Sequence, residues 1–355
     1  MQASAHAKFT AKLRHAASLA VGVLFCTSLL HADVTLRYKN EIKVGAGAPT
    51  ALTQALSTTM KSFMSQSSLI QIKGTQAYTT NGPFITVMDF SKQLITLIDP
   101  AHKQFTTVYM KDYADQVLSV LPGANPAASA NAQKFADSIK TSFSSEMTGR
   151  TDTILGIQAQ ETVLTLTMAI LSPTGASTSP DAAQPGQAQP FMKMVIHLWS
   201  AAPSEIQRLS ALQELAKIYG SDTNSVLNPD GIMEKAFAQM PGMGAGFTQM
   251  MGELSKKKAV TLKGDIEMYS PLLVNALKAM PADGQAARQD VDPNAPIMEI
   301  TMDAVELSGA PIADSVFQVP DDCRVTTVPD FLRATLPSFN QSQAEQPPAD
   351  PPSKQ

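Results

Sequence analysis

The chain has 355 residues, of which 44% are hydrophobic and 16% are charged, and its formal net charge at neutral pH is −4. The charged fraction is too low for an intrinsically disordered chain, and the chain has far too little basic excess for a nucleic-acid-binding protein. The length allows one large domain or two small ones, each with a core of ordinary size.

The first 32 residues have the features of a secretory signal peptide. Three basic residues precede a nearly uninterrupted apolar run over 16–30, and no acidic residue occurs before Asp33. We expect cleavage after Ala32, which removes three basic residues and no acidic ones and so changes the net charge from −4 to −7. The alternative is an uncleaved anchor helix, but about fifteen apolar residues are short compared with the ~20 needed to span a bilayer. The predicted location is therefore the periplasm or the extracellular space.

The segment 33–44 alternates regularly between apolar and polar side chains. Its apolar residues share one face of an extended chain: Val34, Leu36, Tyr38, Ile42 and Val44. Asn40 is the single exception on this face, and the opposite face is polar or charged throughout. This period of two predicts a long strand with one solvent-facing side, which is typical of an antiparallel sheet.

Five short strands are predicted next, over 69–72, 76–80, 84–90, 94–98 and 105–110. Lys73-Gly74 is expected to form a bulge, Asn81-Gly82 a tight hairpin turn, and Asp99-Pro100 the start of another turn. A parallel sheet would need connections of about a dozen residues, so these strands should form an antiparallel meander. A helix is expected over 111–121.

The middle of the chain predicts a weak helix over 132–139 and then four strands, over 142–148, 153–158, 163–171 and 191–199. The last two are apolar on both faces and should lie inside the sheet. The Pro-, Ala- and Ser-rich stretch 172–190 is predicted to be a flexible excursion and not a domain boundary, since the strand pattern resumes after it.

A helical insertion is predicted over 203–256. Its clearest part is a helix over 203–219, because four apolar residues recur at helical spacing and Gly220 is suited to end it. Shorter helical pieces are expected over 231–240 and 247–256. Strands return over 260–268 and 298–302, with a phase shift near Ala304-Val305 that indicates a bulge. We therefore predict a single domain over 33–340, followed by a disordered, proline-rich tail over 341–355.

The sequence contains no recognisable catalytic or metal-binding motif. The chain after residue 32 has two histidines, His102 in a predicted turn and His197 on a predicted strand, and we expect a structural role for both. There is no nucleophile elbow, no zinc-binding His-Glu-x-x-His helix and no phosphate loop. A calcium-loop spacing that begins at Asp290 lacks the turn glycine and the final glutamate. We predict no enzyme, no catalytic residue, no metal and no cofactor.

Methionine is unusually frequent, with 18 residues in the chain. Five methionines crowd the stretch 233–251, and Met192 and Met194 share one face of a predicted strand. Thioethers can bind Cu(I), but no histidine or cysteine lies near the stretch 233–251 to complete such a site. Methionine also fills irregular apolar space and lines adaptable apolar surfaces, which is the better interpretation here.

Three phrases of the sequence resemble one group of proteins. They are Ile98-Asp99-Pro100-Ala101-His102-Lys103-Gln104-Phe105, the stretch 153–162, and Asp314-Ser315-Val316-Phe317-Gln318-Val319-Pro320. This group consists of uncharacterised bacterial exported proteins that are similar in shape to the outer-membrane lipoprotein carriers LolA and LolB. The resemblance implies the α+β class, with an incomplete β-barrel: a strongly curved antiparallel sheet with helices across its concave face. In the carriers this hollow accommodates acyl chains.

Two functional hypotheses follow. In the first, a non-catalytic envelope protein binds lipid or another apolar ligand in the concave sheet, with four candidate lining residues: Met192, Met194, Ile196 and Leu198. Ordinary core packing is the alternative interpretation of these four. In the second, the core is filled and the protein is an envelope interaction module, which an exposed apolar patch near 240–251 would support.

Overall fold

The computed structural model describes the chain between residues 33 and 335, with gaps. The described residues are 33–45, 67–80, 82, 84–119, 138–171, 188–219, 224–225, 228–229, 246, 248–250, 252–253, 259–272, 292 and 294–335. The predicted signal peptide and the predicted tail lie outside them. Most of the predicted helices over 132–139, 231–240 and 247–256 also lie outside the described residues.

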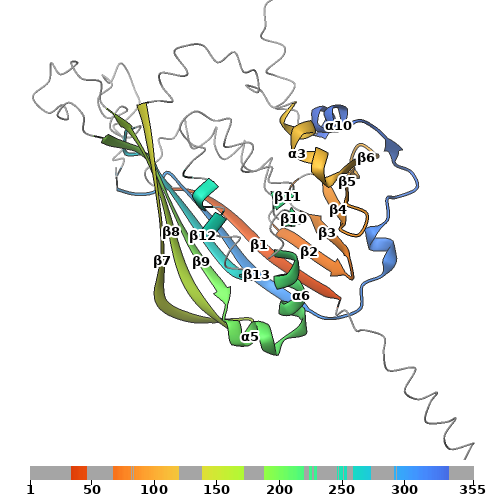
Figure 1. Cartoon of the computed structure of the whole chain (residues 1–355), viewed down its shortest axis with the longest axis horizontal. Helices are drawn as coiled ribbons and strands as arrows, with labels where there is room; N and C mark the ends of the chain where they lie inside the picture. Colours follow the sequence, from red (N-terminus) through yellow and green to blue (C-terminus); the bar gives the residue numbers. More distant parts are fainter. Residues whose placement is uncertain are drawn as a thin grey trace, which may run out of the picture.

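A twelve-stranded open sheet dominates the structure (Figure 1). The strands are β1 (Val34–Val44), β2 (Ser67–Lys73), β3 (Gln76–Thr80), β4 (Ile85–Asp89), β5 (Leu94–Asp99), β6 (Gln104–Tyr109), β7 (Ile139–Ile154), β8 (Ile157–Leu171), β9 (Ala188–Ala201), β12 (Thr261–Tyr269), β13 (Met298–Ser308) and β14 (Arg324–Val325). Their order across the sheet is β14-β6-β5-β4-β3-β2-β1-β13-β12-β9-β8-β7, so β14 and β7 are its edges. Every neighbouring pair is antiparallel except β14, which runs parallel to β6. The α+β class and the antiparallel character predicted from the sequence are confirmed at this level.

The first half of the sheet follows the predicted meander closely. The first strand and the five short strands occur as β1 to β6, and the short strands pair in chain order. The predicted bulge at Lys73-Gly74 is wrong. Lys73 pairs directly with Gln76, and Gly74, with a φ of 57°, lies in the two-residue turn between them. A glycine that accepts positive φ serves this hairpin turn, and no extra residue enters the ladder.

The second half contains a longer hairpin than the sequence predicted. The expected strands over 142–148 and 153–158 are wrong in their boundaries, because β7 continues to Ile154 and the chain turns at Leu155-Gly156 before β8. A bulge between Met147 and Thr151 interrupts the alternation, which made one strand look like two. Ile139 already belongs to β7, so the predicted helix over 132–139 is wrong at its last residue. The bulge predicted near Ala304-Val305 is confirmed, since Arg37 pairs with Glu306 and Tyr38 with Ala304.

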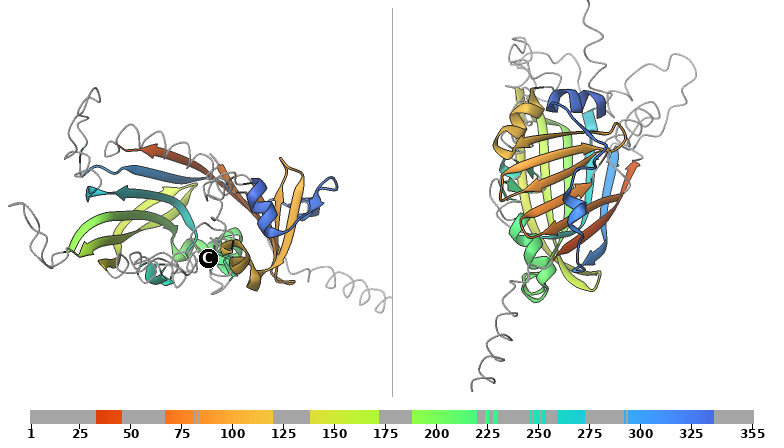
Figure 2. Two further views of the ribbon diagram at one scale, coloured as in Figure 1. Left: turned by 90° about the horizontal axis from the view of Figure 1, so that it is seen from above. Right: turned by 90° about the vertical axis from the view of Figure 1, so that its right-hand side faces the viewer.

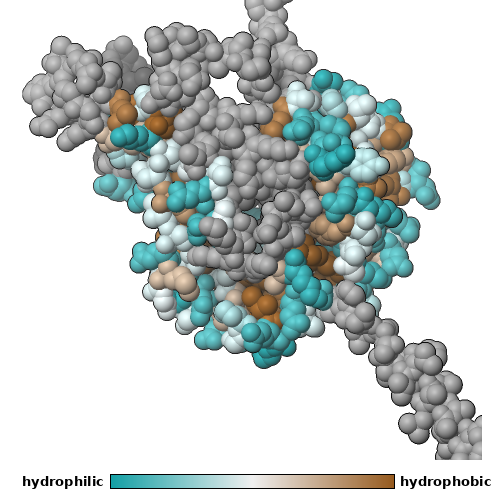
Figure 3. Space-filling view, viewed as in Figure 1, coloured by the Kyte–Doolittle hydropathy of each residue, from teal (hydrophilic) through white to brown (hydrophobic). Residues whose placement is uncertain are grey.

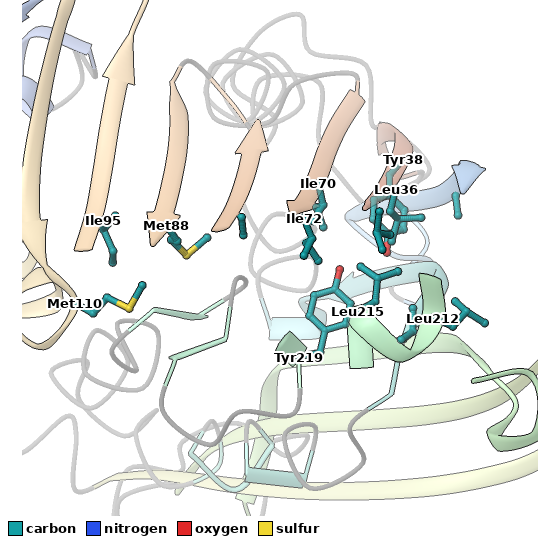
Figure 4. Packing of buried hydrophobic residues seen from close by; sticks show 14 of the residues in the cluster. Leu36, Tyr38, Ile70, Ile72, Met88, Ile95, Met110, Leu212, Leu215 and Tyr219 are labelled. Carbon is teal, nitrogen blue, oxygen red and sulfur yellow. The ribbon is translucent and has the colours of Figure 1, made fainter. Parts of the chain in front are cut away.

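Helices supply much of the core on one face of the sheet. Buried residues of α3 (Met110–Leu118) and α6 (Ser210–Tyr219) pack with the apolar face of β1 to β6. Figure 4 shows Leu36 and Tyr38 pointing toward Leu215 and Tyr219. Seen from above, the sheet bends between its two halves, and these helices lie on the inner side of the bend (Figure 2).

The helix predicted over 203–219 is broken into two. Leu209 has an extended backbone, with φ of −109° and ψ of 115°, and it separates α5 (Pro203–Arg208) from α6. The apolar spacing alone did not reveal this break, because residues on both sides of it pack toward the same core. Strand β9 begins at Ala188, so the excursion predicted over 172–190 is shorter at its C-terminal end. A small separate ladder pairs β10 (Asn224–Ser225) with β11 (Asn228–Pro229).

Residues 312–335, at the C-terminal end of the described chain, form a strap around the meander. It comprises η1 (Asp314–Phe317), β14 and α10 (Val328–Thr335). Phe317 packs against Val87 and Ile98 on one face of the meander, whereas Phe331 belongs to the main core on the other face. Between these two contacts, β14 pairs with the edge strand β6. The strap therefore holds both faces of the meander and its edge.

Candidate functional site

The four residues predicted to line an apolar site lie on one face of β9, and the strand register extends this face across the sheet. Met194 lies opposite Leu166 of β8 and Met268 of β12, and Met268 lies opposite Met298 of β13. Leu166, Met194, Met268 and Met298 thus form one row across β8, β9, β12 and β13. A second, parallel row crosses the same four strands and β1: Leu164, Ile196, Ile266, Ile300 and Ile42. We call these two rows, together with Met192, Leu198 and Met302, the methionine-rich face. It spans five neighbouring strands.

Part of the methionine-rich face is covered by the chain itself. Ile196 is 8% exposed and forms a buried cluster with Leu164 and Met250, against which Met194 and Leu198 also pack. Core packing is therefore the observed environment of Ile196. Met192 lies beyond the two rows, opposite Met168 of β8. Like Met194 and Leu198, it is only half-buried.

The structure describes only part of the stretch 240–251, in which the hypothesis of an interaction module predicts an exposed apolar patch. Met250 is 3% exposed, and the other methionines of this stretch lie outside the described residues. In the view of Figure 3, the described surface is mostly hydrophilic or intermediate, with small separate hydrophobic areas. The described residues thus do not display the patch on which the second hypothesis would rest.

The opposite face of the same strands carries a polar hollow of about 340 Å³. Its polar and aromatic lining residues come from β7, β8, β9, β12 and β13: Arg150, Glu161, His197, Trp199, Lys263, Asp265, Glu267, Glu299 and Thr301. Of these residues, the sequence drew attention only to His197, and then to a structural role. The sequence does not predict the hollow, because its lining residues come from five strands and their pairing register cannot be read from the sequence.

Glu161 is the centre of this hollow. Its side chain is 1% exposed, and its carboxylate accepts hydrogen bonds from the hydroxyl of Thr148 at 2.6 Å and from the guanidinium of Arg150 through both oxygens. Nδ1 of His197 lies 2.9 Å from Oε1, and because the carboxylate only accepts, this nitrogen carries the proton. Burial alone would raise the pKa of Glu161, but these hydrogen bonds lower it below its usual value. The buried carboxylate is therefore held ionised.

The bulge in β7 explains how Glu161 gains two partners from one strand. Met147 pairs with Thr162 and Thr151 with Gln160, so the three residues 148–150 lie opposite Glu161 in the ladder, and Thr148 and Arg150 contact it. Gly149, with a φ of 75°, allows this turn of the backbone. The guanidinium of Arg150 also lies over the ring of Trp199, at 5.8 Å from its centroid, which fixes the arginine between an anion and an aromatic face.

The floor of the hollow is acidic. Glu267 lies directly opposite Glu299, and Asp265 lies opposite Thr301. Nζ of Lys263 is 3.7 Å from Asp265. Such a surface can bind a polar molecule through hydrogen bonds and charge. Within the described ranges, no three His, Cys, Asp or Glu side chains are arranged to hold a metal ion.

A second polar cluster surrounds Asp99 at the start of a turn. Its side chain is 1% exposed and is contacted by Nδ1 of His102 at 2.6 Å and by the hydroxyl of Thr335 at 2.7 Å. The hydroxyl donates to the carboxylate and does not contact the imidazole, so this is not the arrangement that activates a nucleophile. The His102 side chain is 55% exposed, as expected for a turn, and the cluster joins that turn to α10.

Comparisons with known proteins do not assign this chain to a family. No protein-family model matches the chain, and no curated protein is significantly similar to it. None of the helices in the described part of the chain is long and apolar enough to cross a membrane.

Proposed function

We propose that this is an exported, non-catalytic protein of the bacterial envelope that binds an apolar ligand, such as the acyl chain of a lipid or lipoprotein. The binding surface is the methionine-rich face, and the architecture is that of an incomplete barrel similar to LolA and LolB. The observation that carries the proposal is the continuity of apolar residues across five neighbouring strands. The signal-like segment 1–32 supports a location in the periplasm or outside the cell.

Methionine suits this role because its unbranched, polarisable side chain adapts to ligands of different shape. Met194 and Met268 lie opposite each other and are half-buried, so further apolar area is available to a ligand there. Burial of each acyl methylene contributes ~0.8 kcal/mol, so a few methylenes suffice for measurable retention. The polar hollow lies on the other face and is not needed for this function.

The alternative is an interaction module whose core is filled. The packing of Met250 on Ile196 and Leu164 favours it, because this contact uses apolar surface that a ligand would otherwise cover. In this case the protein would engage another envelope protein and would carry no lipid.

Native mass spectrometry of detergent-free protein tests the proposal. We expect the signal-processed protein to carry additional mass that organic extraction identifies as acyl chains. The variant with Met194→Gln and Met268→Gln should retain a fluorescent sixteen-carbon fatty acid at least tenfold more weakly, because two apolar contacts become polar. Val195→Thr is the matched control, since Val195 is the next residue of β9 and points to the opposite face.

Repeated isolation of bare polypeptide, with no fatty-acid uptake by the unmodified protein, would favour the filled-core alternative. Equal loss of uptake in Val195→Thr and in the methionine variant would place the ligand elsewhere. Circular dichroism of each variant, compared with the unmodified protein, shows whether the sheet is intact.

A further inference from the structure

A short helical part of the chain lies on the methionine-rich face. The structure describes it at residues 246, 248–250 and 252–253, all of them helical, and we call these residues the cover segment. Gly246 and Met250 are buried, whereas Thr248 and Gln249 are exposed. Residues four positions apart lie on the same side of a helix, so Gly246 and Met250 together form the side that faces the sheet.

Met250 makes the main apolar contact of the cover segment. Its side chain is 3% exposed and forms a buried cluster with Leu164 of β8 and Ile196 of β9. These two residues lie opposite each other in the ladder and belong to the second row of the methionine-rich face. Half-buried side chains of the same face pack against the cluster, among them Met194 and Leu198. Met250 thus covers part of the surface that we propose for an acyl chain.

Gly246 allows the cover segment to approach the sheet closely. A Cβ atom at this position would lie 2.1 Å from Cγ2 of Thr141 in β7 and 3.0 Å from Cδ1 of Leu166 in β8. Non-bonded carbon atoms prefer a separation of about 3.5–4.0 Å, and the β-branched threonine has little freedom to rotate away. A side chain at position 246 would therefore push the segment away from the sheet.

The cover segment gains little stability from its own sequence. Residues 241–252 contain one proline, at 241, and four glycines, at 242, 244, 246 and 252. Glycine and proline are the least favourable residues in a helix, and short helices are only marginally stable in water. Contacts with the sheet therefore hold the segment in place. A ligand that offers the same sheet residues other apolar contacts can replace it.

From these contacts we infer that the cover segment is an autoinhibitory plug of the apolar site. Without a ligand, Met250 occupies the surface over Leu164 and Ile196, and an acyl chain binds by displacing it. The inference deepens the proposed function, on which it rests, because it states how one face is filled in one state and binds lipid in another. A ligand that competes with a plug binds more weakly than to an open face, in proportion to the fraction of molecules that are open.

Substitutions that loosen the plug should strengthen ligand binding. Met250→Ala removes the buried thioether, and Gly246→Val adds a side chain where the sheet leaves no space for one. Each should lower the dissociation constant of the fluorescent sixteen-carbon fatty acid about fivefold or more, because the open fraction increases. Gln249→Ala is the matched control, since Gln249 is an exposed residue of the same segment and its replacement should leave the constant unchanged. If Met250 were an ordinary core or lining residue, Met250→Ala would leave the affinity unchanged or lower it.

A disulfide tests the position and the displacement of the plug. A Cβ atom at position 246 would lie 3.1 Å from Cβ of Thr141, near the ~3.5–4.5 Å that a disulfide spans. Thr141→Cys/Gly246→Cys, made in a Cys323→Ser background, should therefore form the bond on oxidation. The oxidised protein should bind the fatty acid about tenfold more weakly or worse, because the plug cannot leave, and reduction should restore binding. The two single-cysteine variants are the controls and should not respond to the oxidant.

Equal binding by the oxidised and reduced double variant would overturn the inference and leave the proposed function intact. Unchanged or weaker binding by Met250→Ala and Gly246→Val, with the sheet intact by circular dichroism, would do the same. If Met250→Ala does not fold, Gly246→Val and the disulfide decide. Failure of the disulfide to form would show that the segment does not lie on β7. Absence of binding by every form, the loosened variants included, would contradict the proposed function and the inference together.

Discussion

At the scale of single residues, the most constrained side chain is Glu161. It is buried, it is ionised, and it has three partners from two other strands. Such an arrangement is costly to form, because a charge loses its hydration, and costly to disrupt, because the partners are then left without an anion. We therefore regard it as the structural anchor of the polar hollow.

Replacing Glu161 by glutamine should lower the free energy of unfolding by about 1–3 kcal/mol at pH 7. This expected loss is smaller than the largest losses measured when a buried ion pair is broken, because the Arg150 side chain is exposed and can be hydrated by water once Glu161 is replaced. Urea unfolding measures the loss. Glu306→Gln is the control, since its pair with Arg37 is exposed on both sides and should be worth at most about 0.5 kcal/mol.

Comparison of the unmodified protein with Glu161→Gln also predicts how the free energy of unfolding depends on pH. Folding lowers the pKa of Glu161, so its ionised form stabilises the protein fully above the pKa of the unfolded chain, about 4.3. This contribution is lost as the pH falls through the folded pKa. The difference in the free energy of unfolding between the unmodified protein and Glu161→Gln should therefore become smaller below about pH 4. A constant difference from pH 7 to pH 3 would contradict the ionised state.

The sequence could not have predicted this residue. Glu161 and His197 are 36 positions apart, and they meet only because β8 and β9 pair in one particular register. Alternation revealed that His197 and Met194 lie on opposite faces of β9, which is a local property. It did not reveal which residues of other strands stand beside them.

At the scale of elements, the β7-β8 hairpin is the feature that differs most from expectation. Its turn places Leu155 at a φ of 53°, where a residue with a large side chain is strained, and Leu155 is 45% exposed. Asparagine and glycine are the usual residues of such turns, so leucine gave no signal of a turn. The short strands of the meander were predictable because each was bounded by glycine, proline or aspartate at its turn.

Leu155→Asn should raise the free energy of unfolding by about 0.5–1 kcal/mol. Asparagine tolerates positive φ better than leucine, and little buried contact is lost at an exposed position. Thermal unfolding followed by circular dichroism measures the change. Gly156→Ala is the opposite control: with a φ of 75° at that position, alanine should cost about 1 kcal/mol. A destabilised Leu155→Asn variant would show that the leucine makes contacts that outweigh its strain.

At the scale of the whole molecule, the C-terminal strap determines how the meander is held. Phe331 is fully buried, and its ring meets Phe84 edge to face, with centroids 5.8 Å apart. Thr335 of the same helix donates to Asp99. The meander thus relies on packing from a segment more than 200 residues later in the chain.

Phe331→Ala should lower the free energy of unfolding by about 3–5 kcal/mol, the usual cost of deleting a fully buried phenyl ring. Hydrogen exchange should show the largest loss of protection in β4 to β6. Arg333→Ala, on the exposed side of the same helix, should change the free energy by no more than about 0.5 kcal/mol. A loss below 1 kcal/mol for Phe331→Ala would mean that the strap is not needed for the stability of the meander.

The pairing of β1 with β13 has a consequence for how the molecule is made. β1 is the first of the described strands and lies in the middle of the sheet, whereas its partner β13 is among the last of them to be synthesised. The two halves of the sheet therefore cannot be joined until the ribosome has added residues 298–308. Contacts between such distant segments make folding slow, so the sheet stays open at its centre longer than a sheet built only from neighbouring strands of the sequence.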